Sequence, residues 1–179
     1  MQQIVHLIGP GGAGKTTIGR LLAQRLGWVF IDLDQAFMQR HGDIAEYIAR
    51  EGYEGYAQAN IAAFEGIAHA ALPPLVIALS SGFMTYPTGL RPGDEALRQT
   101  IERHPLTALL LPAFDVERCT SVIVDRQLSR PYLRGDRASE EHRIRARFPL
   151  FMALQCRRFL SDDVPDAVAA RLEAFIRAA

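Results

Sequence analysis

Short apolar runs alternate along this chain with longer segments of helical periodicity. Four runs hold few polar residues and are often bounded by glycine, proline or acidic residues, which is typical of buried parallel strands. The predicted strands are Ile4–Ile8, Trp28–Leu33, Leu75–Leu79 and Leu106–Pro112. The third is the clearest, because Pro73-Pro74 precedes it and Ser80-Ser81-Gly82 follows it.

Helical patterns fill most of the sequence between these runs. Within the first, apolar residues recur three and four positions apart, and Gly27 supplies a stop signal. The predicted helical segments are Lys15–Leu26, a stretch from about 44 to 71 interrupted by Gly52 and Gly55, Val116–Leu128, and the amphipathic Ala167–Ala178. Val122-Ile123-Val124, inside the third segment, would also tolerate a strand.

Strands that alternate with helices predict an α/β fold, a three-layer α/β/α sandwich around a parallel sheet. We find no repeats or long linkers, so residues 1–179 are interpreted as a single domain. Ligands of such sheets bind at the carboxyl ends of the strands. Chemically distinctive residues follow three of the predicted strands there, at 9–16, at Asp32 and Asp34, and at 80–84.

Composition narrows the classes of function. Twenty basic and twenty acidic residues give a formal net charge of zero, so no global field attracts nucleic acid or a membrane surface. Cys119 and Cys156 lack metal-ligand spacing and are expected to be reduced thiols. We see no signal peptide and no apolar stretch of about 18–20 residues, so we expect a soluble, cytoplasmic protein. The oligomeric state cannot be read from this sequence.

The segment Gly9–Thr16 satisfies the phosphate-loop pattern G-x-x-x-x-G-K-[ST]. Its glycines let backbone N–H groups approach phosphate oxygens, and the following helix adds its positive N-terminal dipole. A chance glycine-rich turn is disfavoured, because a strand and a helix flank the motif as required. The residues expected to bind Mg-ATP are Gly9, Gly11, Gly12, Ala13, Gly14, Lys15, Thr16 and Thr17, with Lys15 on the β- and γ-phosphates and Thr16 on Mg²⁺.

Asp32 and Asp34 end the second predicted strand. In an extended segment their side chains would share one side, because side chains repeat every second residue. One carboxylate could hold the hydration shell of Mg²⁺, and the other could orient or deprotonate an acceptor hydroxyl. Acidic residues at a strand end can also simply cap the next helix. Beside a phosphate loop, we favour the catalytic interpretation.

Arginines are dense late in the chain. Seven lie from Arg126 to Arg147, and Asp125, Asp136, Glu140 and Glu141 lie directly before or among them. A solvated helix–loop–helix with surface ion pairs is the simple interpretation, and we expect it for Arg134, Arg137 and Arg145. The density also suggests a helical lid, at about 118–147, that closes on polyphosphate and excludes water.

The order of these motifs resembles the shikimate kinase family. The agreement runs over roughly residues 3–160 and includes Phe30-Ile31-Asp32-Leu33-Asp34, Arg130-Pro131 and the late run Arg147-Phe148-Pro149-Leu150-Phe151. The resemblance implies a P-loop NTPase fold of the nucleoside-monophosphate-kinase type, with about five parallel strands, a lid and a substrate-binding helical segment at about 35–62. It also implies transfer of phosphate from Mg-ATP to the 3-hydroxyl of shikimate.

The resemblance assigns roles residue by residue. It implies that Lys15 is catalytic, that Thr16 and Asp32 lie by the metal, and that Asp34 holds the acceptor hydroxyl. The remaining implied roles are Arg126 as a catalytic lid residue, Arg130 near the adenine, Arg147 on the substrate carboxylate, and Gly82 in the loop beneath the substrate ring.

Two departures from the family pattern concern the acceptor. The family's carboxylate-clamping arginine and its supporting glutamate are replaced by Ala57 and Asn60. The glycine-rich loop reads Ser80-Ser81-Gly82-Phe83-Met84, so Phe83 and Met84 would make the pocket bulkier if they point inward. Loss of one clamp member should cost about 2–4 kcal/mol of binding, or about 30- to 1,000-fold in affinity.

Three functions therefore stay open. The chain phosphorylates shikimate, or it phosphorylates another small alcohol such as a sugar acid, a nucleoside or another metabolite, or it binds a nucleotide without catalysis. Retention of Lys15, Thr16, Asp32 and Asp34 argues against the last, because a binding module has no need for an acceptor-facing carboxylate.

Overall fold

One sheet of five parallel strands, in the order β2-β3-β1-β4-β5, forms the centre of the protein. The computed structural model describes residues 3–70, 74–129 and 136–179. Its strands are β1 (Ile4–Ile8), β2 (Val29–Asp32), β3 (Leu75–Ala78), β4 (Thr107–Leu111) and β5 (Arg157–Leu160). The three central strands are fully buried, as their apolar sequences predict, whereas β2 and β5 form the partly exposed edges.

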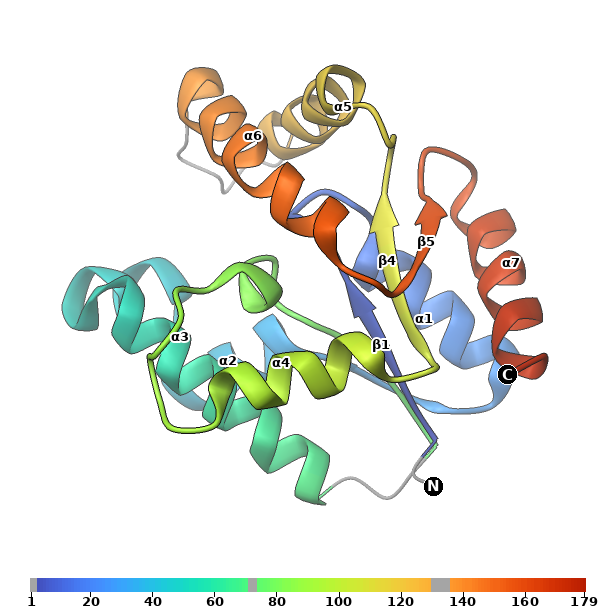
Figure 1. Cartoon of the computed structure of the whole chain (residues 1–179), viewed down its shortest axis with the longest axis horizontal. Coiled ribbons are helices and arrows are strands. Elements are labelled where there is room, and N and C mark those ends of the chain that lie inside the picture. The colour runs from blue at the N-terminus through green and yellow to red at the C-terminus, as the bar shows by residue number, and fades with distance from the viewer. Residues whose placement is uncertain (1–2, 71–73, 130–135) are drawn as a thin grey trace.

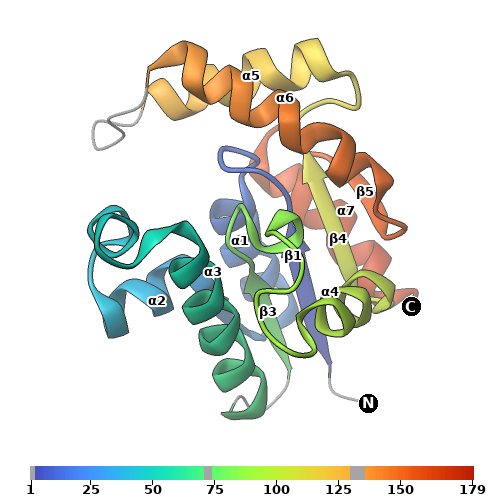
Figure 2. The same ribbon diagram turned by 60° about the vertical axis from the view of Figure 1, so that its left-hand side comes forward.

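Helices cover both faces of the sheet (Figure 1). They are α1 (Lys15–Leu26), α2 (Leu33–His41), α3 (Ile44–Ala70), α4 (Asp94–Arg103), α5 (Val116–Leu128), α6 (Arg137–Ala153) and α7 (Pro165–Arg177), with a short 3₁₀ turn, η1 (Phe83–Thr85). α1 and α7 pack together on one face around Leu22 and Leu172. A larger core, with α2, α3, α5 and α6, fills the other side around Phe37 and Phe151. Figure 2 shows α5 and α6 lying across the carboxyl ends of the strands.

The predicted α/β class and four of the five strands are confirmed. Val122-Ile123-Val124 lies inside α5, so the strand alternative is wrong. The fifth strand was missed because β5 begins with Arg157-Arg158 and has no apolar run, as an edge strand permits. α4 was missed for a similar reason, since it is a largely polar surface helix. No helix in the described ranges is both long enough and apolar enough to span a membrane.

A glycine bends the long helix α3 beside the carboxyl edge of the sheet. Gly52 has φ 75° and ψ 168°, a left-handed region that a residue with a Cβ rarely adopts. The chain resumes as a helix at once, and Tyr53 and Tyr56 follow the bend. Both tyrosines contact Tyr86 from the loop after β3, at ring-centroid distances of 5.9 and 6.2 Å. The bend therefore brings an aromatic group to the end of the sheet that binds ligands.

His6 is a hydrogen-bonded core residue of β1, as its strand position predicts. It is 6% exposed, and its Nδ1 lies 3.2 Å from the Thr107 hydroxyl. That hydroxyl donates to the Ile101 carbonyl oxygen, so it accepts from a neutral His6 ring protonated at Nδ1. Burial, together with the neighbouring His104, lowers the pKa of His6 to about 3.

This lowered pKa predicts an acid-sensitive fold. Between pH 6.5 and 3 the unfolded chain binds a proton at His6 that the native protein excludes, so stability falls as the pH falls. We expect the free energy of unfolding to decrease by about 2 kcal/mol from pH 7 to pH 5 through this residue. Urea denaturation of the wild type and of His6→Asn at both pH values measures the contribution. An equal decrease in the two proteins would show that His6 is not its source.

Candidate functional site

The loop between β1 and α1 has the backbone geometry of a phosphate cradle. Gly9, Gly12 and Gly14 have φ values of 138°, 81° and 88°. A Cβ at Gly9 would overlap the Leu110 carbonyl oxygen, so only glycine fits against β4 at that point. Gly14 caps α1 without a side-chain hydrogen bond, which leaves the first N–H groups of the helix available to an anion. The loop therefore fits a polyphosphate.

Lys15 curls over this loop. Its Nζ donates to the carbonyl oxygens of Gly9 and Pro10 at 2.7 and 2.9 Å. These bonds hold the ammonium group at the mouth of the cradle, where the predicted phosphate contact would form. Ala13 is fully buried beneath the loop, whereas Thr17 is exposed on the first turn of α1.

Thr16 and Asp32 meet beside the loop. The Thr16 hydroxyl donates to Asp32 Oδ2 at 2.5 Å, and Asp32 Oδ1 accepts from the backbone N–H of Gln35 at 3.1 Å. Asp32 thus caps α2 and also joins the phosphate loop. A hydroxyl and a carboxylate oxygen are hard donors that suit Mg²⁺ when most of its other ligands are phosphate and water. Accordingly, the described residues contain no group of three or more His, Cys, Asp or Glu side chains that could hold a metal unaided.

Asp34 lies in the first turn of α2. The expectation of an extended Asp32–Asp34 segment is wrong, because α2 begins at Leu33, whose side chain is fully buried. The helix turns Asp34 toward β3, where Ser80 Oγ donates to its Oδ1 at 2.5 Å. The two carboxylates still reach the same edge of the sheet, because β2 and β3 are adjacent parallel strands.

Several groups set the charge of Asp34. Burial raises the pKa of its carboxyl, and the nearby charge of Asp32 adds to that effect. Hydrogen bonds from Ser80 and Tyr56 and the positive charge of Lys15 lower the pKa of Asp34. Burial and the charge of Asp34 raise the pKa of Tyr56, which keeps that hydroxyl protonated and able to donate. The site thus combines a carboxylate with hydroxyl donors and the ammonium group of the phosphate loop.

The residues that replace the family's clamp are built into the protein core. Ala57 and Asn60 are both 0% exposed, and Asn60 Oδ1 accepts from the Tyr86 hydroxyl at 3.1 Å. Gly82 is pressed between two rings, because an added Cβ would lie 2.6 Å from Tyr53 Oη and 2.7 Å from a carbon of Tyr86. Tyrosines and an amide therefore occupy the region where the family pattern has an arginine–glutamate pair.

Phe83 and Met84 do not point into the acceptor pocket, so they do not make it bulkier. Phe83 is fully buried and packs edge-on against Phe64 of α3, while Met84 packs on the same core. The departure in this loop therefore acts through Ser80, which bonds Asp34, and not through the bulky residues.

Two predicted arginines lie at the site in different ways. Arg147 of α6 donates to the Tyr53 hydroxyl at 2.8 Å and so connects α6 with α3 across the acceptor side. Arg126 of α5 donates to the Gly12 carbonyl oxygen at 3.3 Å and to Asp162 at 3.0 Å. It therefore ties the phosphate loop to the segment after β5. Arg130 lies outside the described residues.

The site residues predicted from the sequence do not include three residues that lie at this site. Ser80 bonds Asp34, Tyr56 acts on the same carboxylate, and Gln127 covers the phosphate loop, where its Nε2 lies 2.5 Å from the position of a Cβ on Gly11. Ser80 had a usable signal, since it directly follows β3 at the ligand-binding edge of the sheet. Tyr56 had only its place in the predicted substrate-binding segment at about 35–62, and Gln127 had none, because the rotation of their helices depends on tertiary packing.

Comparison with known proteins gives the family directly. The family model described as shikimate kinase matches residues 11–177. Shikimate kinase 2 of Yersinia enterocolitica is 42% identical over 84 residues, which are 46% of this chain and 46% of that protein. The shikimate kinase of Paracidovorax citrulli is 38% identical over 94 residues, or 52% and 49% of the two chains. The matches thus span about half the length of these curated relatives.

Solved structures agree with the fold over nearly the whole chain. The shikimate kinase of Acinetobacter baumannii, solved in complex with shikimate, has a TM-score of 0.78 and 21% identity, and the match covers 99% of this chain and 94% of that one. The enzyme from Bacteroides thetaiotaomicron has a TM-score of 0.76 and 22% identity, and it covers 99% of both chains. Because the family model spans nearly all of the sequence, the chain belongs to the shikimate kinase family, whose members are ATP-dependent phosphotransferases that act on a hydroxyl acceptor.

Proposed function

We propose that this protein transfers the γ-phosphate of ATP to a hydroxyl group of a small molecule, as a shikimate kinase or a close functional relative. The observation that carries the proposal is the position of Asp34, a partly buried carboxylate that Ser80 holds beside Lys15 at the mouth of the phosphate loop. A base next to a phosphate cradle has an obvious use in phosphoryl transfer and none in simple nucleotide storage.

In this reaction the acceptor oxygen forms a bond to the γ-phosphorus, and the bond from that phosphorus to the β–γ bridging oxygen breaks. Asp34 orients the acceptor hydroxyl and takes its proton as the new bond forms. Lys15 and the N–H groups of Gly9–Thr16 stabilise the charge on the phosphates. Thr16 and Asp32 would hold Mg²⁺, which neutralises charge on the β- and γ-phosphates when bound. The leaving ADP carries away the electron pair of the broken bond.

The other assignments follow the same reasoning. Thr17 and Arg126 belong to the nucleotide side, and Arg147 and Gly82 to the acceptor side. The role of Arg130 near the adenine stays a prediction, as do the substrate-binding segment at 35–62 and the lid at 118–147. A cytoplasmic location is supported by Cys119 and Cys156, which both remain free thiols.

The identity of the acceptor depends on how its anionic group is bound. Arg147 can engage one carboxylate, but the second clamp position is Ala57, a residue with no exposed surface. Tyr53, which is 36% exposed, presents a hydroxyl and an aromatic face in the same region, and the buried Tyr86 packs against its ring. These features favour a second candidate, an alcohol without a carboxylate that binds by ring stacking and hydrogen bonds to hydroxyls.

An ADP-release assay with Mg-ATP tests whether the protein is a kinase and whether its acceptor carries a carboxylate. The acceptors are shikimate, its carboxamide, quinate, gluconate, nucleosides and water alone. Turnover with any alcohol well above that with water supports the kinase assignment. If shikimate exceeds its carboxamide by 30-fold or more in kcat/KM, a carboxylate site exists in spite of Ala57. Absence of turnover with every alcohol, with ATP still bound, would contradict the kinase assignment.

Ser80→Ala is expected to slow this reaction without harming the fold. The Asp34 carboxylate loses one charge-assisted hydrogen bond, which is worth about 1.5–3 kcal/mol. We expect kcat to fall by about 10-fold while the KM for ATP is unchanged. Steady-state kinetics and thermal unfolding measure both, with the exposed Ser139→Ala on α6 as the matched control. A Ser80→Ala enzyme with the wild-type kcat would show that Ser80 does not position Asp34.

A further inference from the structure

A small cavity lies between the phosphate loop and α6. Its volume is about 30 Å³, and Pro10, Gly11 and Ser81 form its floor. The opposite wall is one face of α6, since its lining residues recur three and four positions apart. These residues are Glu140, Arg143, Ile144 and Arg147, and α5 adds Ile123 and Gln127. Two guanidinium groups therefore border the same space as the loop that binds phosphate.

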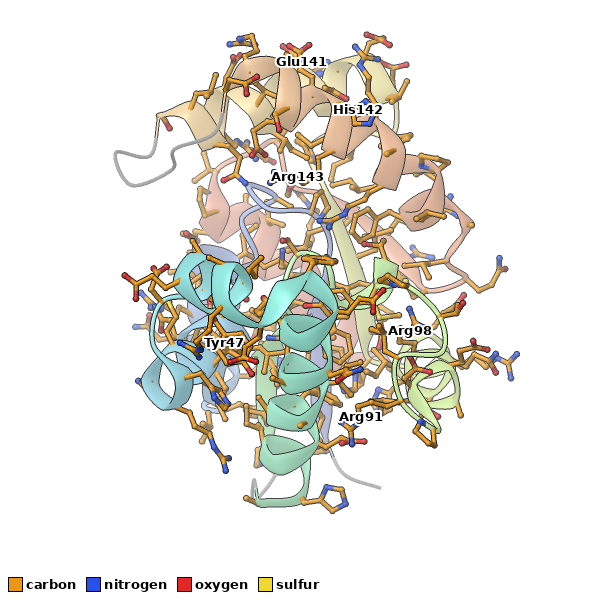
Figure 3. All side chains as sticks on the ribbon, turned by 90° about the vertical axis from the view of Figure 1, so that its left-hand side faces the viewer. Tyr47, Arg91, Arg98, Glu141, His142 and Arg143 are labelled. Atoms are coloured by element: carbon orange, nitrogen blue, oxygen red, sulfur yellow. The ribbon has the colours of Figure 1, made fainter. Side chains whose placement is uncertain are left out.

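The arginines of α6 lie in two environments, the surface shared with α5 and the cavity beside the phosphate loop. Arg137 and Arg145 pair with Asp125 and Glu117 of α5 and are exposed, in agreement with the prediction of surface pairs. Arg143 instead lies at the cavity, and Figure 3 shows it on the side of α6 that faces the phosphate loop, whereas Glu141 lies on the outer side. Only the orientation of the helix separates these otherwise similar residues.

Glu140 fixes the position of Arg143. Its carboxylate accepts from Arg143 Nη1 at 2.9 Å, and its side chain is 7% exposed while that of Arg143 is 52% exposed. A carboxylate this buried needs a compensating partner, unlike the members of an ordinary surface pair. The remaining guanidinium N–H groups of Arg143 make no hydrogen bond to any residue in the described ranges. The fork is thus anchored at one nitrogen and has donors left for a second anion.

We propose that Arg143 is a catalytic residue that binds the transferred phosphoryl group from the side opposite the phosphate loop, with Glu140 as its positioning residue. A planar fork with several donors matches the tetrahedral oxygens of a phosphoryl group better than a point charge does. The group would then lie between the N–H groups of the loop and the guanidinium group of Arg143. The expected effect on kcat rests on the proposed function. The expected effect on nucleotide binding does not, because a contact with the γ-phosphate changes the affinity for ATP whether or not phosphate is transferred.

Arg143→Gln tests the assignment through two readouts. The first is binding of Mg-ADP and of the non-hydrolysable analogue Mg-AMP-PNP, measured by titration calorimetry. We expect AMP-PNP to bind about 10- to 100-fold more weakly, the effect of one charge-assisted contact, while ADP affinity changes less than about 2-fold. The second is steady-state kinetics, where kcat should fall by about 100-fold with the KM for the acceptor unchanged. Free guanidinium ion should restore part of the lost rate.

Matched variants exclude a structural explanation. Arg137→Gln removes a charge from the same helix at an outward-facing pair and should leave both readouts at the wild-type level. Glu140→Gln keeps the side-chain volume but weakens the bond that positions the Arg143 guanidinium group, so it should lower kcat although Arg143 itself is unchanged. The proposal is overturned if Arg143→Gln weakens ADP and AMP-PNP equally, or if it changes neither AMP-PNP affinity nor kcat. Should no acceptor support turnover by the wild type, the comparison of AMP-PNP with ADP alone decides.

Discussion

Asp34→Asn is expected to reduce kcat by about 10²- to 10⁴-fold, the usual contribution of a positioned general base. Asparagine keeps the shape of the side chain and can still accept the hydrogen bond from Ser80, so the geometry around β3 is preserved. It cannot take a proton from the acceptor hydroxyl. Because the amide carries no charge, it avoids the desolvation cost that the carboxylate has at this position. The stability of the protein should therefore not fall.

The measurement pairs turnover with nucleotide affinity and thermal unfolding. ATP should bind Asp34→Asn within about 2-fold of its wild-type affinity, because Lys15 and the phosphate loop are untouched. Asp43→Asn is a suitable control, since Asp43 caps α3 at an exposed position through bonds to the N–H groups of Ala45 and Glu46. If Asp34→Asn retains more than about a tenth of the wild-type kcat, Asp34 is not the base.

The parts of this site that could be predicted are those whose functional residues are neighbours in the sequence. The phosphate loop needs neighbouring glycines, Lys15 and Thr16, and a strand–helix context that periodicity reveals. The contact of Asp34 with Ser80 joins residues 46 positions apart. The sequence predicted only that the two segments lie at the same edge of the sheet, because the carboxyl ends of parallel strands meet there. It did not predict the bond itself.

The parts that could not be predicted depend on the rotation of helices. The sequence offers seven arginines from Arg126 to Arg147 with similar neighbours. Packing of α6 on α5 turns Arg145 outward to Glu117 and Arg143 toward the phosphate loop, and the sequence pattern does not distinguish them. The same limit explains the wrong geometry for Asp34, since the pattern gave no sign that α2 begins at Leu33.

Lys15→Met is expected to lower kcat by about 10²- to 10³-fold, because the charge that develops on the transferred phosphoryl group loses a positioned donor. Lys15 is the single lysine of the chain. Its bonds to the carbonyl oxygens of Gly9 and Pro10 also brace the loop, so the substitution should weaken ATP binding as well. Lys15→Arg should recover little activity, because a planar fork cannot reproduce a compact ammonium group in this cradle.

Because there is one lysine, an amine-reactive acetylating reagent gives a second, independent measurement. Apart from the amino terminus, only Lys15 can be acetylated, and mass spectrometry of the peptide that contains it reports the extent. Mg-ATP should protect Lys15 by about 10-fold or more when it is saturating, whereas adenosine, which lacks phosphates, should not. If adenosine protects as well as ATP, or if Lys15→Met keeps the wild-type kcat, then Lys15 does not contact the phosphates, and the assignment of the cradle must be revised.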